Sequence, residues 1–161
     1  MDITAEISHS LASAVIRIFA TMGSLTVALV KSEDASISAS ASLHEVTGNV
    51  SFAGTSIAGV IYLSLPSALA RRVAGAITGD EASLTDQDEN DVLGEFTNMV
   101  TGNIKTHMAD KGFNSALSIP NVLRGNAISV SCKGFSIAQT FTFSVEGSPE
   151  TFQVLALVKA D

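Results

Sequence analysis

Apolar residues recur every three or four positions in two long stretches of the chain, a pattern typical of helices that bury one face. The first stretch is residues 3–22 and is followed by Gly23, and the second is residues 86–110 and is followed by Gly112. Glycine commonly ends helices because it adopts the left-handed conformation without steric cost. A shorter apolar pattern follows Pro66 over residues 67–77 and stops at Gly79. The pattern therefore predicts two long amphipathic helices and one short one.

Strands are predicted where short runs alternate between apolar and polar residues or are apolar throughout. These runs are residues 25–30, 46–52, 59–65, 116–119, 127–132, 139–145 and 152–159. Residues 31–42 are rich in serine and alanine and fit a loop or an edge strand, and residues 146–150 fit the turn of a final hairpin. The order of elements predicts an α/β (α+β) domain, with long helices on one face of a mainly antiparallel sheet.

The second long helix has a clear start. Thr85 is followed three residues later by Asp88, a weaker form of the capping box because aspartate replaces glutamate or glutamine. Acidic residues crowd the first turns, where the positive end of the helix dipole favours carboxylates. They are Asp86, Asp88, Glu89 and Asp91.

A polar stripe lies on this helix, opposite its apolar face. At about 100° per residue, one narrow stripe contains Asp91, Glu95, Asn98, Gly102 and Lys105. Glu95 and Asn98 are one turn apart, so their side chains project side by side. Gly102 costs roughly 1 kcal/mol within a helix, and close approach of another surface is one reason to keep it. The stripe fits either an ordinary solvated face or a site that meets a partner.

Composition narrows the class of protein. The chain has 161 residues, 46% of them hydrophobic and 16% charged, which predicts one domain with a sizeable core. The formal charge is −7 and the one basic cluster is Arg71-Arg72, so nucleic acid is not expected as a partner. Cys132 is the one cysteine, and it is expected to be buried in a protein of a reducing compartment.

No stretch fits a membrane span or a signal peptide. The most apolar stretch, residues 57–70, contains Pro66 and falls short of the roughly 20 residues that cross a bilayer. The acidic residues Asp2 and Glu6 stand near the start, where a signal peptide would be positively charged. We therefore expect a cytoplasmic protein that binds no membrane.

Familiar catalytic and metal-binding patterns are missing. His9, His44, His107 and Cys132 show no spacing of metal ligands, and no phosphate-binding loop or nucleophile elbow is present. His107 and Asn103 fall on the apolar face of the long helix, where structural roles in the core are expected. An amide such as that of Asn98 is no useful base, but it orients a water molecule by donating one hydrogen bond and accepting another.

The segment Gly94 to Thr106, GEFTNMVTGNIKT, resembles the signature helix of the CheC/CheX/FliY family of chemotaxis phosphatases. The family's motif is Asp or Ser, then Glu, Asn and a distant Pro, and Asp91, Glu95, Asn98 and Pro120 match it. Residues 46–79 are similar to the family's strand–strand–helix segment. The resemblance covers most of the chain and is strongest to the single-motif CheX branch, so it implies a CheC-like fold.

The resemblance also implies a function. Family members dephosphorylate CheY-like receiver domains that carry an aspartyl phosphate, and the receiver supplies Mg²⁺ and a lysine. By this resemblance Asn98 would align the attacking water and Glu95 would pair with the receiver's lysine. Asp91, Gly102, Lys105 and Pro120 would support the helix or contact the partner. A homodimer with no metal or cofactor of its own is implied. The alternative is a non-catalytic adaptor of the same fold, docking on a receiver or a flagellar switch protein.

The two halves of the chain, residues 1–80 and 81–161, look alike. Each opens with a long helix, a glycine and a short apolar strand. Aligning Gly23 with Gly112 places Asp2, Glu6 and His9 at the positions of Asp91, Glu95 and Asn98. The pattern fits an internal duplication whose first half is degenerate, since a histidine stands where the amide should be. Chance matches at Asp2 and Glu6 within a scaffold half are the alternative, and whether these positions retain any activity is open.

Overall fold

A computed structural model describes residues 1–35 and 40–161. The helices are α1 (Ile3–Met22), α2 (Ser67–Thr78), the short 3-10 helix η2 (Glu81–Ser83) and α3 (Asp86–Ala109). The strands are β1 (Val27–Asp34), β2 (Ser40–Leu43), β3 (Val46–Ala53), β4 (Ile57–Leu65), β5 (Ala116–Leu117), β6 (Asn121–Arg124), β7 (Ile128–Ser131), β8 (Ile137–Val145) and β9 (Thr151–Ala160).

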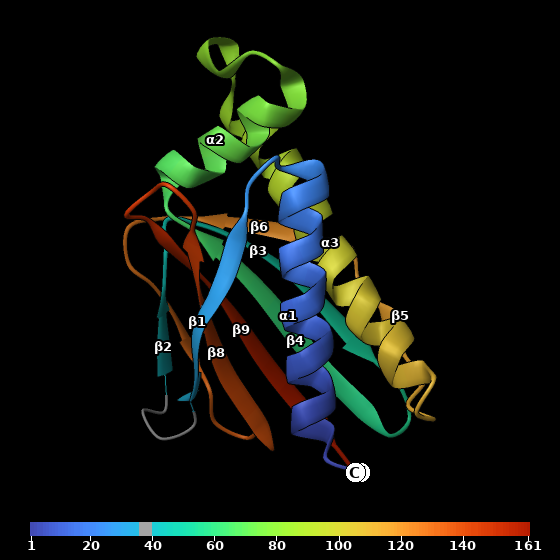
Figure 1. Ribbon diagram of the computed structural model, residues 1–161. Helices are drawn as coiled ribbons and strands as arrows, with labels where there is room; N and C mark the ends of the chain where they lie inside the picture. Colours follow the sequence, from blue (N-terminus) through green and yellow to red (C-terminus); the bar gives the residue numbers. More distant parts are fainter. Residues whose placement is uncertain (36–39) are drawn as a thin grey trace.

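A seven-stranded antiparallel sheet forms the centre of the molecule, in the order β1-β8-β9-β4-β3-β5, and β6 also pairs with β3. Strands β2 and β7 form a separate two-stranded ribbon. Helices α1 and α3 lie side by side across one face of the large sheet, and α2 lies at one end (Figure 1). The α+β architecture with long helices on an antiparallel sheet is therefore confirmed.

All three predicted helices are confirmed, because amphipathic periodicity and end signals are local. The left-handed φ of 81° at Gly79 ends α2, as expected from glycine. Strand β1 extends beyond the predicted 25–30. Of the loop or edge strand expected over 31–42, residues 31–34 belong to β1 and 40–42 to β2, while 36–39 lie outside the described residues.

Strand β6 was not predicted. Its four residues, Asn-Val-Leu-Arg, show no clear alternation, and it forms by pairing with β3 from Val46↔Arg124 to Asn49↔Asn121. Strand β5 stops at Leu117, shorter than the predicted 116–119. Together β5 and β6 cover the edge of β3 in two short segments, with Pro120 between them.

The main core lies between the two long helices and the sheet. Four phenylalanines form a chain of contacts through it. The Phe19 ring of α1 meets Phe96 of α3 edge-to-face with centroids 5.3 Å apart, and it stacks on Phe152 of β9 at 4.6 Å. Phe152 in turn stacks on Phe143 of β8 at 5.2 Å. Aromatic pairs of this kind add to the free energy gained by burial alone.

Helix α1 is long and apolar enough, by length and composition alone, to cross a membrane. In this structure it belongs to the core, and Leu11, Val15 and Phe19 are fully buried against α3 and the sheet. Core packing therefore accounts for its composition. On the opposite face of the sheet, a smaller cluster under the β2–β7 ribbon buries Cys132, as expected, together with Leu155.

The strand order has an internal symmetry. When β5 is left out, exchanging β1, β3 and β4 with β6, β8 and β9 leaves the order of the sheet unchanged apart from its direction, and β2 and β7 pair with each other. The duplication of residues 1–80 and 81–161 within one domain stays a prediction, with which this symmetry is consistent.

Candidate functional site

The start of α3 is held by the predicted capping box. The Asp88 backbone N–H donates to Thr85 Oγ1 at 3.2 Å, and the Thr85 N–H donates to Asp88 Oδ2 at 2.9 Å. The second of these bonds, with the Thr85 backbone, is the main reason that the pKa of Asp88 lies below its ordinary value. The register of the helix is therefore set at its first turn, ahead of the polar stripe.

Close packing on the sheet sets the orientation of α3. At Gly48 of β3 the helix comes so near that an added Cβ would collide with Thr97 Oγ1 and lie 3.2 Å from the Leu93 carbonyl oxygen. Phe96 and Val100 are fully buried on this side of the helix. The opposite side is thereby turned outward.

The structure places the predicted pair on that outward side. Glu95 is exposed, and Asn98, one turn further along, is half-buried. Across residues 1–35 and 40–161, neither side chain forms a hydrogen bond or an ion pair with another part of the chain. The carboxylate and the amide are therefore free to bind groups brought by another molecule.

A groove of about 390 Å³ runs beside Glu95. One wall is α3, with Asn90, Asp91, Gly94 and Glu95, and the other is the segment Pro120, Asn121 and Val122. The walls come together at Gly94, where an added Cβ would lie 3.6 Å from Pro120 Cβ. The structure therefore brings together three of the four motif residues, Asp91, Glu95 and Pro120, although Pro120 is distant in the sequence.

Asp91 also has a contact within α3, whereas Gly102 and Lys105 do not line the groove. Asp91 is exposed, and its Oδ1 accepts a hydrogen bond from Gln87 Nε2 at 2.7 Å, which supports the first turns of the helix. Gly102 and Lys105 are half-buried further along the stripe. An added Cβ on Gly102 would meet only Leu117, at 3.9 Å. No close approach within the described chain therefore requires a glycine at position 102.

The corresponding residues of α1 are engaged within the chain. Glu6 Oε2 lies 2.6 Å from His107 Nε2, in the last turn of α3, and 3.8 Å from Lys111 Nζ, just after that helix. The hydrogen bond to His107 is the first cause of a lowered pKa at Glu6. Asp2 caps α1 by accepting from the Ala5 N–H at 3.2 Å, and His9 is exposed. Glu6 therefore joins α1 to the C-terminal end of α3, and Asp2 stabilises the start of α1.

Two expectations about the apolar face of α3 were wrong in part. His107 and Asn103 do have structural roles, but they are half-buried and do not lie in the core. Asn103 Oδ1 accepts from Arg17 Nη2 at 2.5 Å, and its amide donates to the Met99 carbonyl at 2.8 Å. Both side chains join α3 to α1 at the edge of the helix pair. The helical period of α3 places them on its apolar face, but at this edge that face meets α1 and not the core.

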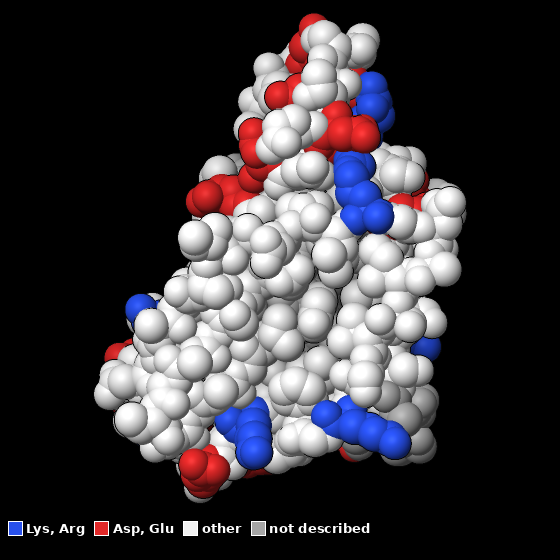
Figure 2. Space-filling view, turned by 180° about the vertical axis from the view of Figure 1, so that it is seen from behind, with Lys and Arg blue, Asp and Glu red and all other residues white. Residues whose placement is uncertain are grey.

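An ion cluster that the sequence did not predict lies at the start of α3. Glu89 was expected to be one of several acidic residues favoured by the helix dipole, but its side chain is only 4% exposed and pairs with Arg71 and Arg124. Seen from behind, acidic residues gather at the end of the molecule formed by α2 and the start of α3, with basic residues beside them (Figure 2). No sequence signal identified the partners, which come from α2 and β6.

Metal-binding side chains are not gathered anywhere in the described part of the chain: no three or more His, Cys, Asp or Glu residues could jointly hold an ion. The site therefore consists of an unpaired carboxylate and an unpaired amide on one helix, beside a groove bounded by a proline.

The structure is thus an α+β domain that presents an exposed carboxylate and a half-buried amide on one long helix. The family model described as "Chemotaxis phosphatase CheX" matches residues 46–144, more than half of the chain, and the chain belongs to this family. A comparison with curated protein sequences gave no match.

Solved structures share the fold over nearly the whole chain. The CheX protein of Desulfovibrio desulfuricans has a TM-score of 0.83 at 22% identity, covering 96% of this chain and 99% of that one. CheX of Vibrio vulnificus gives 0.82 at 22% identity with the same coverage. A CheX–CheY–BeF₃–Mg²⁺ complex from Borrelia burgdorferi gives 0.76 at 20% identity, covering 99% of both chains. These likenesses confirm the CheX/CheC-like fold.

Proposed function

We propose that this protein hydrolyses the aspartyl phosphate of a CheY-like receiver domain. The observation that carries the proposal is that Glu95 and Asn98 stand one turn apart on the outward side of α3, without partners in the described chain. Membership of a family of chemotaxis phosphatases and the CheX–CheY complex of a relative support a receiver as the substrate.

In the proposed reaction Asn98 enters the receiver's site and orients a water molecule in line with the phosphoryl group. The amide accepts a hydrogen bond from the water and donates another toward the phosphoryl oxygens. Attack forms a new P–O bond to the water and breaks the P–O bond to the aspartate. The products are the aspartate carboxylate and inorganic phosphate, which carries both protons of the attacking water and releases one to solvent according to pH. Such chemistry depends mainly on positioning and charge neutralisation, so one inserted amide is sufficient.

Glu95 would pair with the receiver's lysine and set the register of docking. Asp91 would act mainly through its bond with Gln87, by stabilising the start of the helix. Pro120 would shape the groove beside Gly94 and perform no chemistry. Gly102 and Lys105 would be contacted by the partner, because they continue the stripe beyond Asn98.

Charge neutralisation would come from the receiver. We propose that Mg²⁺ is bound by the receiver's own carboxylates and that this chain contributes neither a metal nor another cofactor. Asp86 and Asp91, which are exposed near the start of α3, suit a cationic patch on the partner. Complementary charge of this kind accelerates encounter more than it tightens binding.

A homodimer is part of the proposal. The sheet has exposed edges at β1 and at the β5–β6 side, and an unpaired edge favours association with a second strand. Val30 of β1 is 57% exposed, so this edge presents apolar surface. We also expect the protein to act in the cytoplasm, where receiver domains are phosphorylated, with no role for nucleic acid or membrane.

The test is phosphate release from candidate phosphorylated receivers, measured with and without the protein. We expect loss of phosphate to accelerate with wild type and to return toward the intrinsic rate with Asn98→Ala. Binding of the phosphorylated receiver without any acceleration would support the adaptor alternative instead. Neither binding nor acceleration, across receivers from the same genome, would contradict both.

A further inference from the structure

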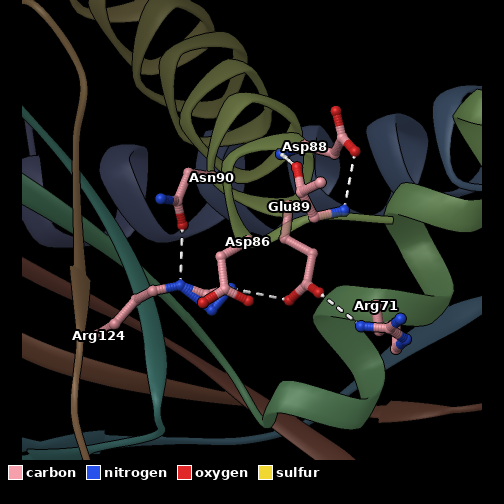
Figure 3. A network of polar contacts seen from close by, with 7 residues as sticks. Arg71, Asp86, Asp88, Glu89, Asn90 and Arg124 are labelled. Atoms are coloured by element: carbon pink, nitrogen blue, oxygen red, sulfur yellow. Dashed lines mark hydrogen bonds and ion pairs between the residues drawn. The ribbon is translucent and has the colours of Figure 1, made fainter. Parts of the chain in front are cut away.

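Arg124 reaches from the end of β6 to three residues at the start of α3 (Figure 3). Its Nη2 lies 2.9 Å from Glu89 Oε1, and its Nε donates to Asn90 Oδ1 at 3.0 Å. Asp86 Oδ1 lies 3.7 Å from the same Nη2. One guanidinium group therefore binds the first two turns of the helix at several points.

The contact with Glu89 has a fixed geometry because that carboxylate is buried. Its side chain is 4% exposed, and its second oxygen, Oε2, lies 3.2 Å from Arg71 Nη1 of α2. A buried carboxylate is strongly unfavourable unless its oxygens are paired, so displacing either arginine is costly. Arginine suits this role because its planar group presents several donors in a rigid fork, which lysine cannot reproduce.

Arg124 closely follows the residues that form one wall of the groove, so its contacts with α3 connect that wall to the helix. The residues just before it, Pro120, Asn121 and Val122, form one wall of the groove beside Glu95. Its partner Asn90 belongs to the opposite wall, on α3. Strand β6 is held to the sheet by only four residue pairs with β3. Arg124 therefore links the segment that forms one wall of the groove to the helix that forms the other, in addition to the short pairing of β6 with β3.

We propose that Arg124 is a positioning residue that fixes the width of this groove and thereby controls docking of the phosphorylated receiver. The inference rests on the proposed function for its substrate, but the tie between the walls is testable without any receiver. Arg124 touches neither Glu95 nor Asn98, so its effect is on binding of the partner and not on the orientation of the water.

Arg71 is a matched control within the same cluster. It binds the other oxygen of Glu89, but it comes from α2, which contributes no residue to either wall of the groove. Replacing either arginine with lysine keeps the charge beside Glu89 and loses the fork. Both variants are expected to lower the melting temperature to a similar extent. Only Arg124→Lys is expected to loosen the groove.

The kinetic test compares the two variants over a range of phosphorylated receiver concentrations. Arg124→Lys should raise KM about tenfold while kcat stays within about twofold, because docking geometry is lost and the catalytic amide is untouched. Arg71→Lys should leave both within about twofold of wild type. An equal rise in KM for both variants, an unchanged KM for Arg124→Lys, or a loss confined to kcat would overturn the proposal.

Hydrogen–deuterium exchange tests the tie independently. Arg124→Lys should accelerate amide exchange in residues 121–124, whereas Arg71→Lys should not. If Arg124→Lys folds poorly, Asn90→Ala removes the Nε acceptor, keeps the Glu89 bridge, and should give the same local change. Unchanged exchange in both groove variants would refute the role of Arg124. A receiver that wild type neither binds nor dephosphorylates would refute the proposed function instead.

Discussion

Glu6 and His107 meet across the two long helices, with the glutamate Oε2 and the imidazole Nε2 2.6 Å apart. Glu6 is the residue of α1 that aligns with Glu95 of α3 in the two halves of the chain. Its carboxylate is bound within the molecule, whereas that of Glu95 has no partner in residues 1–35 and 40–161. Only the helix of the second half therefore has a free carboxylate at this position.

This contact predicts a dependence on pH. The His107 hydrogen bond holds the pKa of Glu6 below its ordinary value of 4.5. A carboxyl group whose pKa is lowered by folding stabilises the folded state above its unfolded pKa, and this contribution is lost as the pH falls through the lower, folded pKa. His107→Ala should therefore raise the pKa of Glu6, measured by NMR titration of its carboxyl carbon. Lys111→Ala should raise it less, because that ammonium lies 3.8 Å away. An identical Glu6 titration in wild type and His107→Ala would contradict this reading.

Asn98→Ala tests the catalytic amide. It should lower the dephosphorylation rate by roughly 10²–10³, the scale for losing one preorganised polar group in a water-excluded site. The dissociation constant for the phosphorylated receiver should change little, because the lost interaction belongs mainly to the transition state. Rates from single turnovers and affinity from titration separate the two effects. A variant that works at the wild-type rate would refute the role assigned to Asn98.

Glu95→Ala should behave differently from Asn98→Ala. It removes a charge that would pair with the receiver's lysine in the ground state and the transition state alike, so kcat/KM should fall mainly through KM. His9 of α1 occupies the position that corresponds to Asn98, so His9→Ala is the control and should change neither kcat nor KM. A fall in kcat alone for Glu95→Ala, or any comparable loss for His9→Ala, would contradict the assignment.

Gly48 and Gly94 predict opposite effects of alanine on stability. Alanine at position 48 would collide with Thr97 Oγ1, which is held by a 2.7 Å hydrogen bond to the Leu93 carbonyl. Overpacking of this kind should lower the free energy of unfolding by roughly 1–3 kcal/mol. Alanine at position 94 meets Pro120 Cβ at an ordinary 3.6 Å, so its better helix propensity should raise stability by up to about 1 kcal/mol. Urea denaturation measures both, and a stable Gly48→Ala would argue against the close approach of α3 to β3.

The mass in solution tests the proposed dimer. At micromolar concentration we expect twice the 16.6 kDa of one chain by sedimentation equilibrium. Val30→Lys on β1 should weaken the dimer if that edge forms the contact, since an edge lysine opposes strand pairing. Leu123→Lys, on β6 at the other edge of the sheet, is the matched control. A monomeric wild type would exclude the dimer. If Leu123→Lys alone dissociated the dimer, the contact between the two chains would lie at the β6 edge and not at β1.

Local geometry made much of the site predictable from the sequence. The helical period alone places Glu95 and Asn98 one turn apart, opposite Phe96 and Val100. Likewise Thr85 forms its capping box with a residue three positions away, so no distant part of the chain is needed to define it. Such features depend on backbone dihedrals and on neighbours within one or two turns of the helix. The sequence pattern therefore predicts them without knowledge of the rest of the fold.

Only tertiary structure decided which side chains met across the fold. Glu89 is separated by 18 residues from Arg71 and by 35 from Arg124, and nothing in its sequence neighbourhood distinguishes it from the solvated acidic residues around it. Its burial follows from where α2 and β6 come to rest, and β6 itself forms because β3 presents an open edge. Long-range pairing of this kind depends on the packing of the whole sheet. A local pattern of apolar and polar residues cannot predict it.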